Sequence, residues 1–549
     1  MTALLDRPRP ARHDAPPAPR PVARFVLPVA LALYATAAAV LVLGFDSIME
    51  DALSRLSAAS SVWSALDPKL AAVGFVWTPL PALLMVPFTP LRVLWPELVS
   101  TGLLAALLSA VAMAGAVAAL HGLLGDLRVR PAARWTLTVL FALHPLVLVY
   151  SANGMTEALL LLFLLLATRR LLVWMRDGER ADATHLVAAG LFLGLGYLAR
   201  YEAIVAAAAV TVLVAATTAL RTRRGPDRVP NVLVDALLVG LPAAAAFVLW
   251  AVVSWAVVGS PFEQFTSVYG NSALVAGGTG GAAGTADVGR QLLWLVPLAP
   301  LVLVAAAVRA VRRRDPVVLV PVVLFGSVLA FEWVLHLAGS LFGFLRYQIA
   351  LVPLVAVLLG VLLSRGALAA GARRGPSWRT AGAVGLVAVV LGSALASSAV
   401  LVLTRPELAS QEHLRVAPVV AALAGEADPD PGANGMWADD RALAARLDAL
   451  DLPAGSVLAD SGSAFAVVAA SRNPRQFVIT SDDGFSAALA DPPAHVRYLL
   501  RNERGGVDTV RATWPDLGAA GGPSWARLVA EHPGAGRWSY AWTLWEVGA

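Results

Sequence analysis

Three carboxylates stand directly after the first long apolar stretch of the chain, in the segment GFDSIMEDALSRL (residues 44–56). They are Asp46, Glu50 and Asp51. A carboxylate beside the hydrocarbon of a membrane is expensive to place, so such a group is either solvated at a helix end or retained for a function. The function open to it at a membrane surface is that of a general base. The other ionisable residues of the chain bear on this choice.

Further charged side chains stand at the ends of later apolar stretches. Glu157 opens TEALLLLFLLLA, where the positive end of a helix dipole would by itself stabilise an acid. Arg200 and Glu202 lie in LARYEA, between two apolar stretches with almost no loop to solvate them. Arg200 either forms a local ion pair or binds an anion, since a planar guanidinium holds phosphate oxygens in pairs. Arg346 and Tyr347 precede another apolar stretch in LRYQIALVP.

The segment between residues 45 and 97 carries two more candidates. Lys69 is the only lysine of the sequence, and it is either solvated or in contact with a phosphate. Trp77 stands among prolines in GFVWTPLPALL. Together with Trp63 and Trp95, it is expected to anchor short helices at the membrane interface.

Composition places these residues in a membrane protein. Of the 549 residues, 58% are hydrophobic and 14% are charged, and the mean hydropathy is +0.70. A soluble protein has roughly 25% charged residues. Apolar stretches of about 20 residues, the length that crosses a ~30 Å hydrocarbon core, recur from Arg24 to about Thr404. Glu332 and His336 stand four residues apart inside one of them.

Arginine clusters separate these stretches in pairs, which predicts the topology. By the positive-inside rule the clusters stay in the cytoplasm, so we expect about eleven transmembrane helices with the N-terminus in the cytoplasm. The expected spans are residues 25–45, 98–121, 135–152, 156–174, 185–200, 203–220, 232–257, 291–309, 316–337, 347–364 and 380–403.

The two ends of the chain have a soluble character. Residues 1–24 are rich in proline and arginine and are expected to form a disordered cytoplasmic tail, followed by an apolar stretch too long for a cleavable signal. After Thr404, four short apolar segments predict strands, at 455–460, 475–483, 496–502 and 541–547. The predicted fold class is therefore an all-α polytopic membrane protein, with a transmembrane domain over 25–404, an external loop of interfacial helices over 46–97, and a small extracytoplasmic α/β domain over 405–549.

Several classes of site are excluded. The chain has no cysteine, which removes disulfides, thiolate nucleophiles and cysteine-bound metals. The segment GGTGGAAG (277–284) lacks the Lys-Ser/Thr of a P-loop, and the eight histidines show no HExxH spacing. The net charge of +5 comes from arginines between the apolar stretches, so no nucleic-acid partner is expected.

In this order, the motifs resemble the GT-C superfamily of integral membrane glycosyltransferases. The order is an acidic pair after the first span, a Trp/Pro-rich loop, an acid that opens the fourth span, the glycine-rich GLFLGLGYLARYEA, and a late Arg-Tyr. The pattern covers about residues 25–365. It is most similar to the branch with protein O-mannosyltransferases and the aminoarabinose transferases of lipid A. The C-terminal segment also resembles the tails of actinobacterial members.

The resemblance implies a base, a donor and a set of substrate contacts. The donor is a sugar linked to a polyprenyl phosphate, and the base is an acid of the first loop. By position the acidic motif is Glu50–Asp51, so Asp51 is implied first, then Glu50, then Asp46. Relatives often have a lysine where this chain has Trp77–Thr78. The implied substrate-binding residues are Glu157, Arg200, Glu202, Arg346, Tyr347, Lys69 and Trp77.

The expected activity is transfer of a sugar to an extracytoplasmic acceptor, which is a cell-envelope glycan, a lipid or a protein, at the plasma membrane. One carboxylate would deprotonate the acceptor hydroxyl, and one or two guanidiniums would neutralise the departing phosphate. No cofactor is certain, and a divalent cation oriented by Glu157 stays open, with unknown metal ligands. The alternatives are a secondary transporter, which would carry acids near the midplane of broken helices, and a non-catalytic lipid-binding membrane protein. Transfer predicts that Asp51, Glu157 and Arg200 converge in one cavity.

Overall fold

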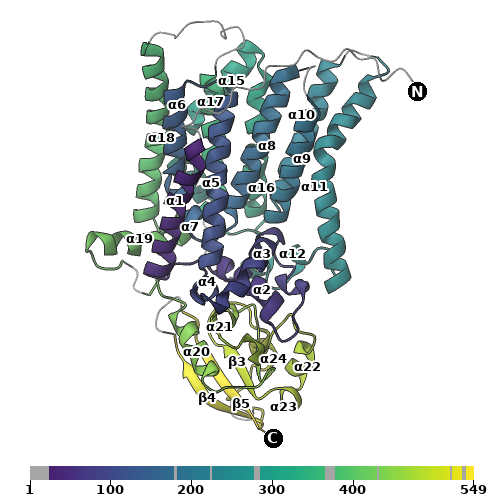
Figure 1. The fold of residues 1–549 in the computed structure, drawn as a ribbon, viewed down its shortest axis with the longest axis vertical. Coiled ribbons are helices and arrows are strands. Elements are labelled where there is room, and N and C mark those ends of the chain that lie inside the picture. Colours follow the sequence, from purple (N-terminus) through teal and green to yellow (C-terminus); the bar gives the residue numbers. More distant parts are fainter. Residues whose placement is uncertain are drawn as a thin grey trace.

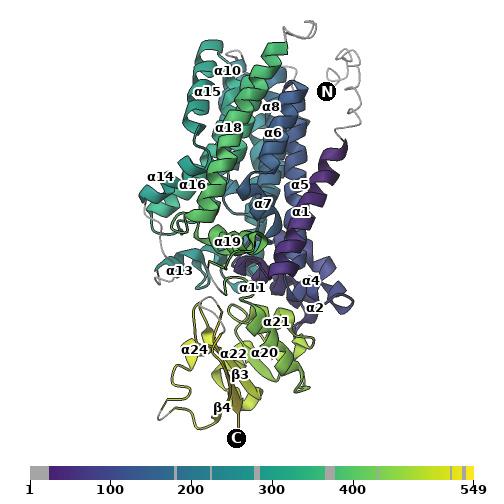
Figure 2. The same ribbon diagram turned by 90° about the vertical axis from the view of Figure 1, so that its left-hand side faces the viewer.

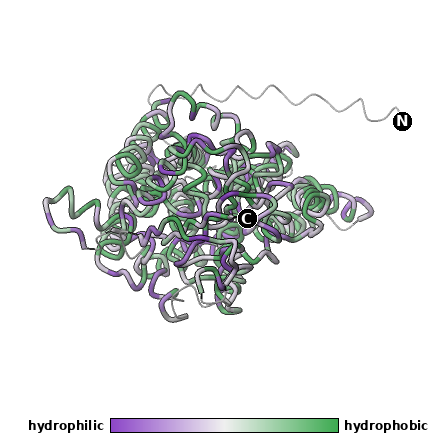
Figure 3. Tube along the Cα trace, turned by 90° about the horizontal axis from the view of Figure 1, so that it is seen from below, coloured by the Kyte–Doolittle hydropathy of each residue, from purple (hydrophilic) through white to green (hydrophobic). Residues whose placement is uncertain are grey.

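A computed structural model of the chain describes residues 24–178, 182–222, 225–276, 285–364, 377–429, 432–519, 522–534 and 539–548. The predicted tail, apart from Arg24, and the segment 277–284 lie outside these residues. Long helices lie side by side in a bundle, and a five-stranded sheet projects from one end of it (Figure 1, Figure 2). Seen from that end, the C-terminus lies near the middle of the outline (Figure 3). We call the end of the bundle from which the sheet projects the sheet end.

Within the described residues, eight helices are long and apolar enough to cross a membrane, and two bent helix pairs raise the number to ten if each pair is one span. The chain is therefore a multi-pass membrane protein. The eight spans are α1 with the following π-helical turn (Val26–Gly44), α5 (Leu103–Asp126), α8 (Glu157–Asp177), α10 (Ala203–Arg221), α11 (Arg228–Val258), α16 with η6 (Pro316–Leu337), α17 with η7 (Leu345–Leu363) and α18 (Ser377–Thr404).

The remaining three predicted spans take other forms. The span predicted at 135–152 is the pair α6 (Pro131–Ala142) and α7 (Pro145–Ala152), bent by 57° where Pro145 prevents the helix from continuing. The span predicted at 291–309 is the pair α14 (Thr285–Leu295) and α15 (Ala299–Arg313), bent by 76°. The span predicted at 185–200 is α9 (Thr184–Ala199), an apolar helix of 16 residues that is shorter than a full span.

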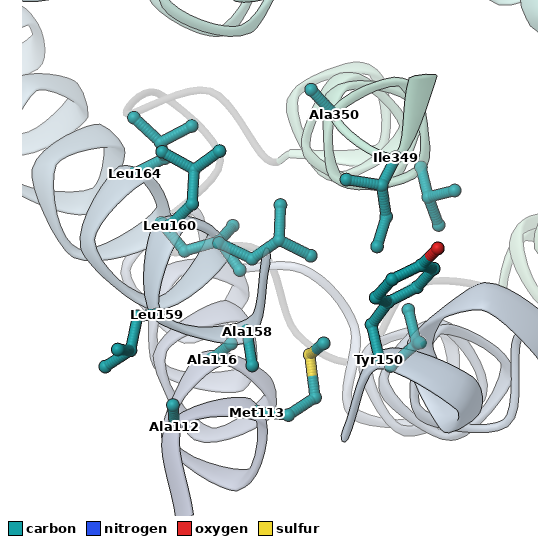
Figure 4. Close-up of a cluster of buried hydrophobic side chains, with 14 of the residues drawn as sticks. Ala112, Met113, Ala116, Tyr150, Ala158, Leu159, Leu160, Leu164, Ile349 and Ala350 are labelled. Atoms are coloured by element: carbon teal, nitrogen blue, oxygen red, sulfur yellow. The ribbon is translucent and has the colours of Figure 1, made fainter. Parts of the chain in front are cut away.

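Small side chains let the helices approach closely in the core. Figure 4 shows Ala116 of α5 beside Ala158 of α8, with Tyr150 of α7 and Ile349 across from them, and all four are buried. Close contact of this kind is how membrane helices associate without a hydrophobic driving force between them. The core therefore fixes the ends of α7 and α8, next to the acid Glu157.

The glycine-rich stretch of α9 also lets two helices approach closely. A Cβ atom added at Gly190 would lie 2.5 Å from the backbone oxygen of Val239 on α11, and one at Gly194 would lie 3.0 Å from the oxygen of Pro242. Only glycine allows this distance between the two helices. The contact fixes α9, whose last residue precedes Arg200.

The chain between α1 and α5 forms a layer of short helices between the bundle and the sheet (Figure 1). The first of them, α2, begins at Glu50 and Asp51, two acids that favour the positive end of its dipole. The layer exposes Val93 and Leu94 to 84% each, and its position at the membrane interface remains a prediction. The members are α2 (Glu50–Ser64), η3 (Leu70–Val73), α3 (Leu80–Met85), η4 (Val86–Val93) and α4 (Glu97–Ser100).

The C-terminal sheet has the order β2-β1-β3-β5-β4, in which β1 pairs in parallel with β2 and β3, and β5 pairs antiparallel with β3 and β4. The four predicted strands correspond to β1 (Val457–Ala459), β2 (Phe477–Val478), β3 (Tyr498–Asn502) and β5 (Trp542–Val547). The sequence pattern did not predict β4 (Ala526–His532). It is an edge strand in which consecutive Leu528 and Val529 are both exposed, so that the alternation of a half-buried strand is lost.

Short helices accompany these elements. The pair α12 and α13 follows α11, and α19 follows α18 and leads toward the sheet, whose own helices are α20 to α24 (Figure 1). Their bounds are α12 (Glu263–Thr266), α13 (Asn271–Ala276), α19 (Ser410–Ala424), α20 (Ala438–Asp448), α21 (Phe465–Ala470), α22 (Phe485–Ala490), α23 (Pro492–His495) and α24 (Thr509–Thr513).

Candidate active site at the sheet end of the bundle

A polar pocket of about 30 Å³ lies where several helices end at the sheet end of the bundle. A second, mostly apolar pocket of about 80 Å³ shares Val76, Trp77 and Tyr201 with it. The two pockets together place charged groups beside an apolar space. The polar pocket is lined by Asp51, Arg55, Val76, Trp77, Thr78, Thr156, Ala199, Arg200, Tyr201, Glu202, Arg346 and Tyr347. The second pocket adds Gln264, Phe265, Gly270, Phe331, Leu335 and Ser340.

Apart from Arg55, which lies within α2, the charged residues of the site stand at helix ends, where the chain turns at the sheet end. Asp51 is in the first turn of α2, and Glu157 is the first residue of α8. Arg200 and Glu202 occupy the tight junction between α9 and α10, and Arg346 lies in the short η7 before α17. The predicted turns between apolar stretches therefore bring together residues that lie up to 295 positions apart.

Arg200 connects two buried carboxylates. Its Nη1 donates to Glu157 Oε1 at 2.7 Å and to Thr156 Oγ1 at 3.3 Å, and its Nε donates to Glu202 Oε1 at 2.9 Å. Both carboxylates are buried, with Glu157 1% and Glu202 0% exposed. Burial by itself would raise the pKa of Glu202, but Arg200 and the hydrogen bonds to this carboxylate lower it. The ion pair and the anion-binding hypotheses for Arg200 are thus compatible.

Arg346 connects Glu157 to Asp51. Its Nη2 lies 3.3 Å from Asp51 Oδ2, and its Nε lies 3.8 Å from Glu157 Oε1. The Asp51 side chain is 28% exposed, whereas those of Arg346 and Glu157 are 6% and 1% exposed. Glu157 is therefore enclosed between two guanidiniums, and Asp51 is the carboxylate that a substrate in the pocket can reach.

Arg55 is a site residue that the sequence analysis missed. It is 6% exposed, its Nη1 donates to the backbone oxygen of Asp51 at 3.2 Å, and its guanidinium lies 4.3 Å from the ring centre of Trp77. Desolvation lowers the pKa of Arg55, and the neighbouring Asp51 opposes that shift. The i,i+4 spacing of Asp51 and Arg55 on one helix face was the signal available.

Glu332 reaches the site from below. It lies on α16, is 2% exposed, and its carboxyl group lies against that of Glu202. His336, four residues later, lies apart from it, with Nδ1 3.4 Å from the backbone oxygen of Leu341. The four-residue spacing thus did not produce a Glu–His pair.

Three of the candidates from the first loop lie outside the polar pocket. Asp46 accepts from both terminal nitrogens of Arg441 on α20, at 2.9 and 2.5 Å, and Lys69 forms an ion pair with Asp483. Glu50 is exposed and does not line the polar pocket.

The donor set does not fit a divalent cation. In the described part of the chain, no group of three or more His, Asp or Glu side chains has the arrangement to hold a metal ion. One oxygen each of Asp51, Glu157 and Glu202 already faces a guanidinium. Three guanidiniums around one pocket favour an anion, because anions pair with arginine in charge-assisted hydrogen bonds.

Comparison with known proteins identifies the fold. No family model matches the sequence, and no curated protein matches it. Among solved structures, apo ArnT from Cupriavidus metallidurans matches with a TM-score of 0.51 and 16% identity, over 95% of this chain and 97% of that one. The apo oligosaccharyltransferase of Archaeoglobus fulgidus matches with a TM-score of 0.46 and 12% identity, over 87% of this chain and 70% of that one. AglB, an archaeal oligosaccharyltransferase from the same organism, in complex with an inhibitory peptide and a dolichol-phosphate, matches with a TM-score of 0.46 and 11% identity, over 88% of this chain and 70% of that one. The predicted fold class is thus confirmed, and the chain has the fold of ArnT, the GT-C fold.

Proposed function

We propose that this chain is a membrane glycosyltransferase that moves a sugar from a polyprenyl-phosphate donor to an acceptor hydroxyl at the extracytoplasmic surface. The observation that carries the proposal is one pocket that holds an accessible carboxylate, Asp51, together with the guanidiniums of Arg55, Arg200 and Arg346. The fold, the sequence resemblance and the adjacent apolar pocket support it.

Asp51 is the general base in this proposal. Its carboxylate takes the proton of the acceptor hydroxyl while the oxygen attacks the anomeric carbon. The bond from that carbon to the phosphate oxygen breaks, and the electron pair leaves with the polyprenyl phosphate. General-base assistance of this kind contributes about 10²–10⁴-fold to the rate. Glu50 and Asp46 are less suited, because Glu50 does not line the polar pocket and Asp46 is held by Arg441.

The three arginines hold the phosphate, which gains a negative charge as it leaves. Preorganised positive charge in a site with little water is among the largest contributions to catalysis. Arg200 and Arg346 are fixed by Glu157, so they need no reorganisation when the bond breaks. Trp77 and Tyr347 offer ring faces to the sugar or the first isoprene unit, and Trp77 and Tyr201 border both pockets.

The test is turnover by the purified chain. It is reconstituted in lipid nanodiscs and incubated with radiolabelled polyprenyl-phosphate sugars and a membrane extract as acceptor source. We expect the wild type to transfer label and Asp51→Asn to lose at least about 10²-fold in rate while keeping its thermal midpoint. Asp227→Asn is the matched control, since Asp227 is an exposed acid in the turn before α11, away from the pocket.

Three outcomes contradict the proposal. Unchanged turnover by Asp51→Asn removes this residue as the base, and Glu50→Gln then tests the neighbouring acid. Binding of the donor without any transfer, across a panel of sugars and extracts, identifies a non-catalytic lipid-binding protein. Uptake of a solute into sealed vesicles without transfer identifies the transporter.

A further inference from the structure

A buried carboxyl beneath the pocket has no role in the mechanism above. Glu332 on α16 is 2% exposed and Glu202 is fully buried, and one oxygen of each has no donor within reach. The two carboxyl groups lie against each other. Ionised carboxylates offer only acceptors, so a hydrogen bond between them requires a proton. The pair therefore shares one.

The charges around the pair lead to the same conclusion. Arg200, Arg346, Glu202, Tyr201 and Tyr347 are the titratable groups that face Glu332 from the neighbouring elements. With Glu332 ionised, four carboxylates would face the three guanidiniums of the site, and one buried charge would be left uncompensated at a high cost. With Glu332 protonated, three carboxylates face three guanidiniums. The site is then neutral before an anion enters.

We propose that Glu332 is a positioning residue that holds a proton against Glu202 and so keeps the charge of Arg200 available to the donor phosphate. The neutral carboxyl of Glu332 donates to one oxygen of Glu202, whose other oxygen accepts from Arg200. Loss of the proton places one more negative charge beneath the anion. The identity of the anion rests on the proposed function, whereas the shared proton does not.

The proton itself is tested without any substrate. Infrared spectra of the full chain in nanodiscs report the C=O stretch of protonated carboxylic acids. At neutral pH, we expect the difference spectrum of wild type minus Glu332→Gln to show a band of this kind. Glu412→Gln is the matched control: Glu412 is a buried carboxyl on α19 that accepts from Tyr150 at 2.5 Å, so its band has a different position. If this difference spectrum shows no band of a protonated carboxylic acid, the proposal is overturned.

The effect on the anion is tested by binding. The probe is a radiolabelled polyprenyl methyl phosphate, a phosphodiester whose headgroup keeps one negative charge across the pH range used. We expect wild-type affinity to fall on the order of 10-fold to 100-fold on the alkaline side, as a charge appears near the anion. Glu332→Gln replaces the carboxyl O–H donor by an amide N–H donor that does not ionise, so it should retain the affinity without the alkaline fall. Glu332→Ala removes both the donor and the charge, so it should weaken binding on the acid side and show no alkaline fall.

The same alkaline fall in wild type and Glu332→Gln would overturn the proposal. Asp440→Asn is the control for distant titration, because Asp440 lies in the C-terminal domain and its burial raises its pKa to about 7. It should leave the alkaline fall unchanged. If the probe fails to bind the wild type at any pH, the proposed donor is wrong, and the infrared result still decides whether the proton is present.

Discussion

At the scale of single residues, two carboxylates with the same arginine neighbour have different exposures. Asp51 and Glu157 both contact Arg346, yet their side chains are 28% and 1% exposed. A reacting group must be reached by the substrate, while a group that orients a guanidinium works best when it is enclosed by the protein. This difference assigns reaction to Asp51 and orientation to Glu157 in our proposal.

Arg200→Lys is predicted to be a damaging exchange. A lysine ammonium is a point charge and does not reproduce the fork that contacts Glu157, Glu202 and Thr156 at once. We expect affinity for the phosphodiester probe to fall about 10-fold to 100-fold, together with a lower thermal midpoint. The control is Arg169→Lys, an arginine whose side chain is 37% exposed and paired with Asp126 at the other end of the bundle. Equal affinity in both variants would exclude Arg200 from the anion site.

At the scale of elements, the site is an assembly of helix ends. The first turn of α2, the start of α8, the α9–α10 junction and η7 each supply one or two residues. Helix ends are fixed by packing against their neighbours, so small residues outside the pocket lining set its geometry. Gly154 shows this most directly, because it lies between α7 and α8 and contacts α2.

Gly154→Ala is predicted to displace α2. Gly154 has φ +79°, and a Cβ there would lie 2.7 Å from Cβ of Ala52, the residue after Asp51, and 3.0 Å from Cβ of Ala105. The left-handed backbone alone costs roughly 1–2 kcal/mol. We expect a lower thermal midpoint and loss of transfer. Gly44→Ala is the matched control, since a Cβ at Gly44 meets nothing within 4 Å. If Gly154→Ala behaves as this control does, the close contact does not position Asp51.

Asp440 predicts a pH dependence of stability in the C-terminal domain. It is fully buried and accepts from Trp542 Nε1 at 3.0 Å, and desolvation raises its pKa from 3.8 to about 7. The folded state therefore binds the proton more tightly than the unfolded state, and stability falls as pH rises between these values. The total loss is about 4 kcal/mol. Asp440→Asn, which keeps an acceptor for Trp542, should raise the thermal midpoint of the full chain at alkaline pH and change little at acid pH. A midpoint that stays the same at alkaline pH contradicts this.

The helices were more predictable than the contacts between them. Run length and composition located α1, α5 and α8, because a membrane span must be long and apolar wherever it packs. The bend at Pro145 and the edge strand β4 were not predicted, since both depend on contacts with other elements, which the local sequence pattern does not reveal. The convergence of Asp51 and Arg200 followed from counting helix ends. The roles of Arg55 and Glu332 could not be predicted in this way, because each is defined by a partner on another element or by burial.

At the scale of the whole molecule, the C-terminal domain closes over the first loop. Asp46 pairs with Arg441, Arg92 donates to the backbone of Ser471 at 2.5 Å, and Tyr269 donates to Asp460 at 2.9 Å. The last contact joins the domain to the segment that lines the apolar pocket. The domain thus holds both sides of the site.

The proposed orientation makes a prediction for labelling in intact cells. The chain has no cysteine, so single cysteines can be introduced without background. Glu97→Cys at the exposed start of α4, at the sheet end, should react with a membrane-impermeant maleimide, and Arg313→Cys at the arginine-rich end of α15 should react only after the cells are opened. The reverse pattern would place the site in the cytoplasm and exclude an extracytoplasmic acceptor.

The pairing of Asp46 with Arg441 joins residues 395 positions apart. A ribosome that adds about 5–20 residues per second needs roughly 20–80 s to cover this distance. The acid-bearing loop is thus among the first parts to be made, and it waits through most of translation for the segment that secures it. A truncated nascent chain would insert its helices and yet leave this loop unfastened, so the order of biogenesis itself delays the moment at which the pocket takes its final form.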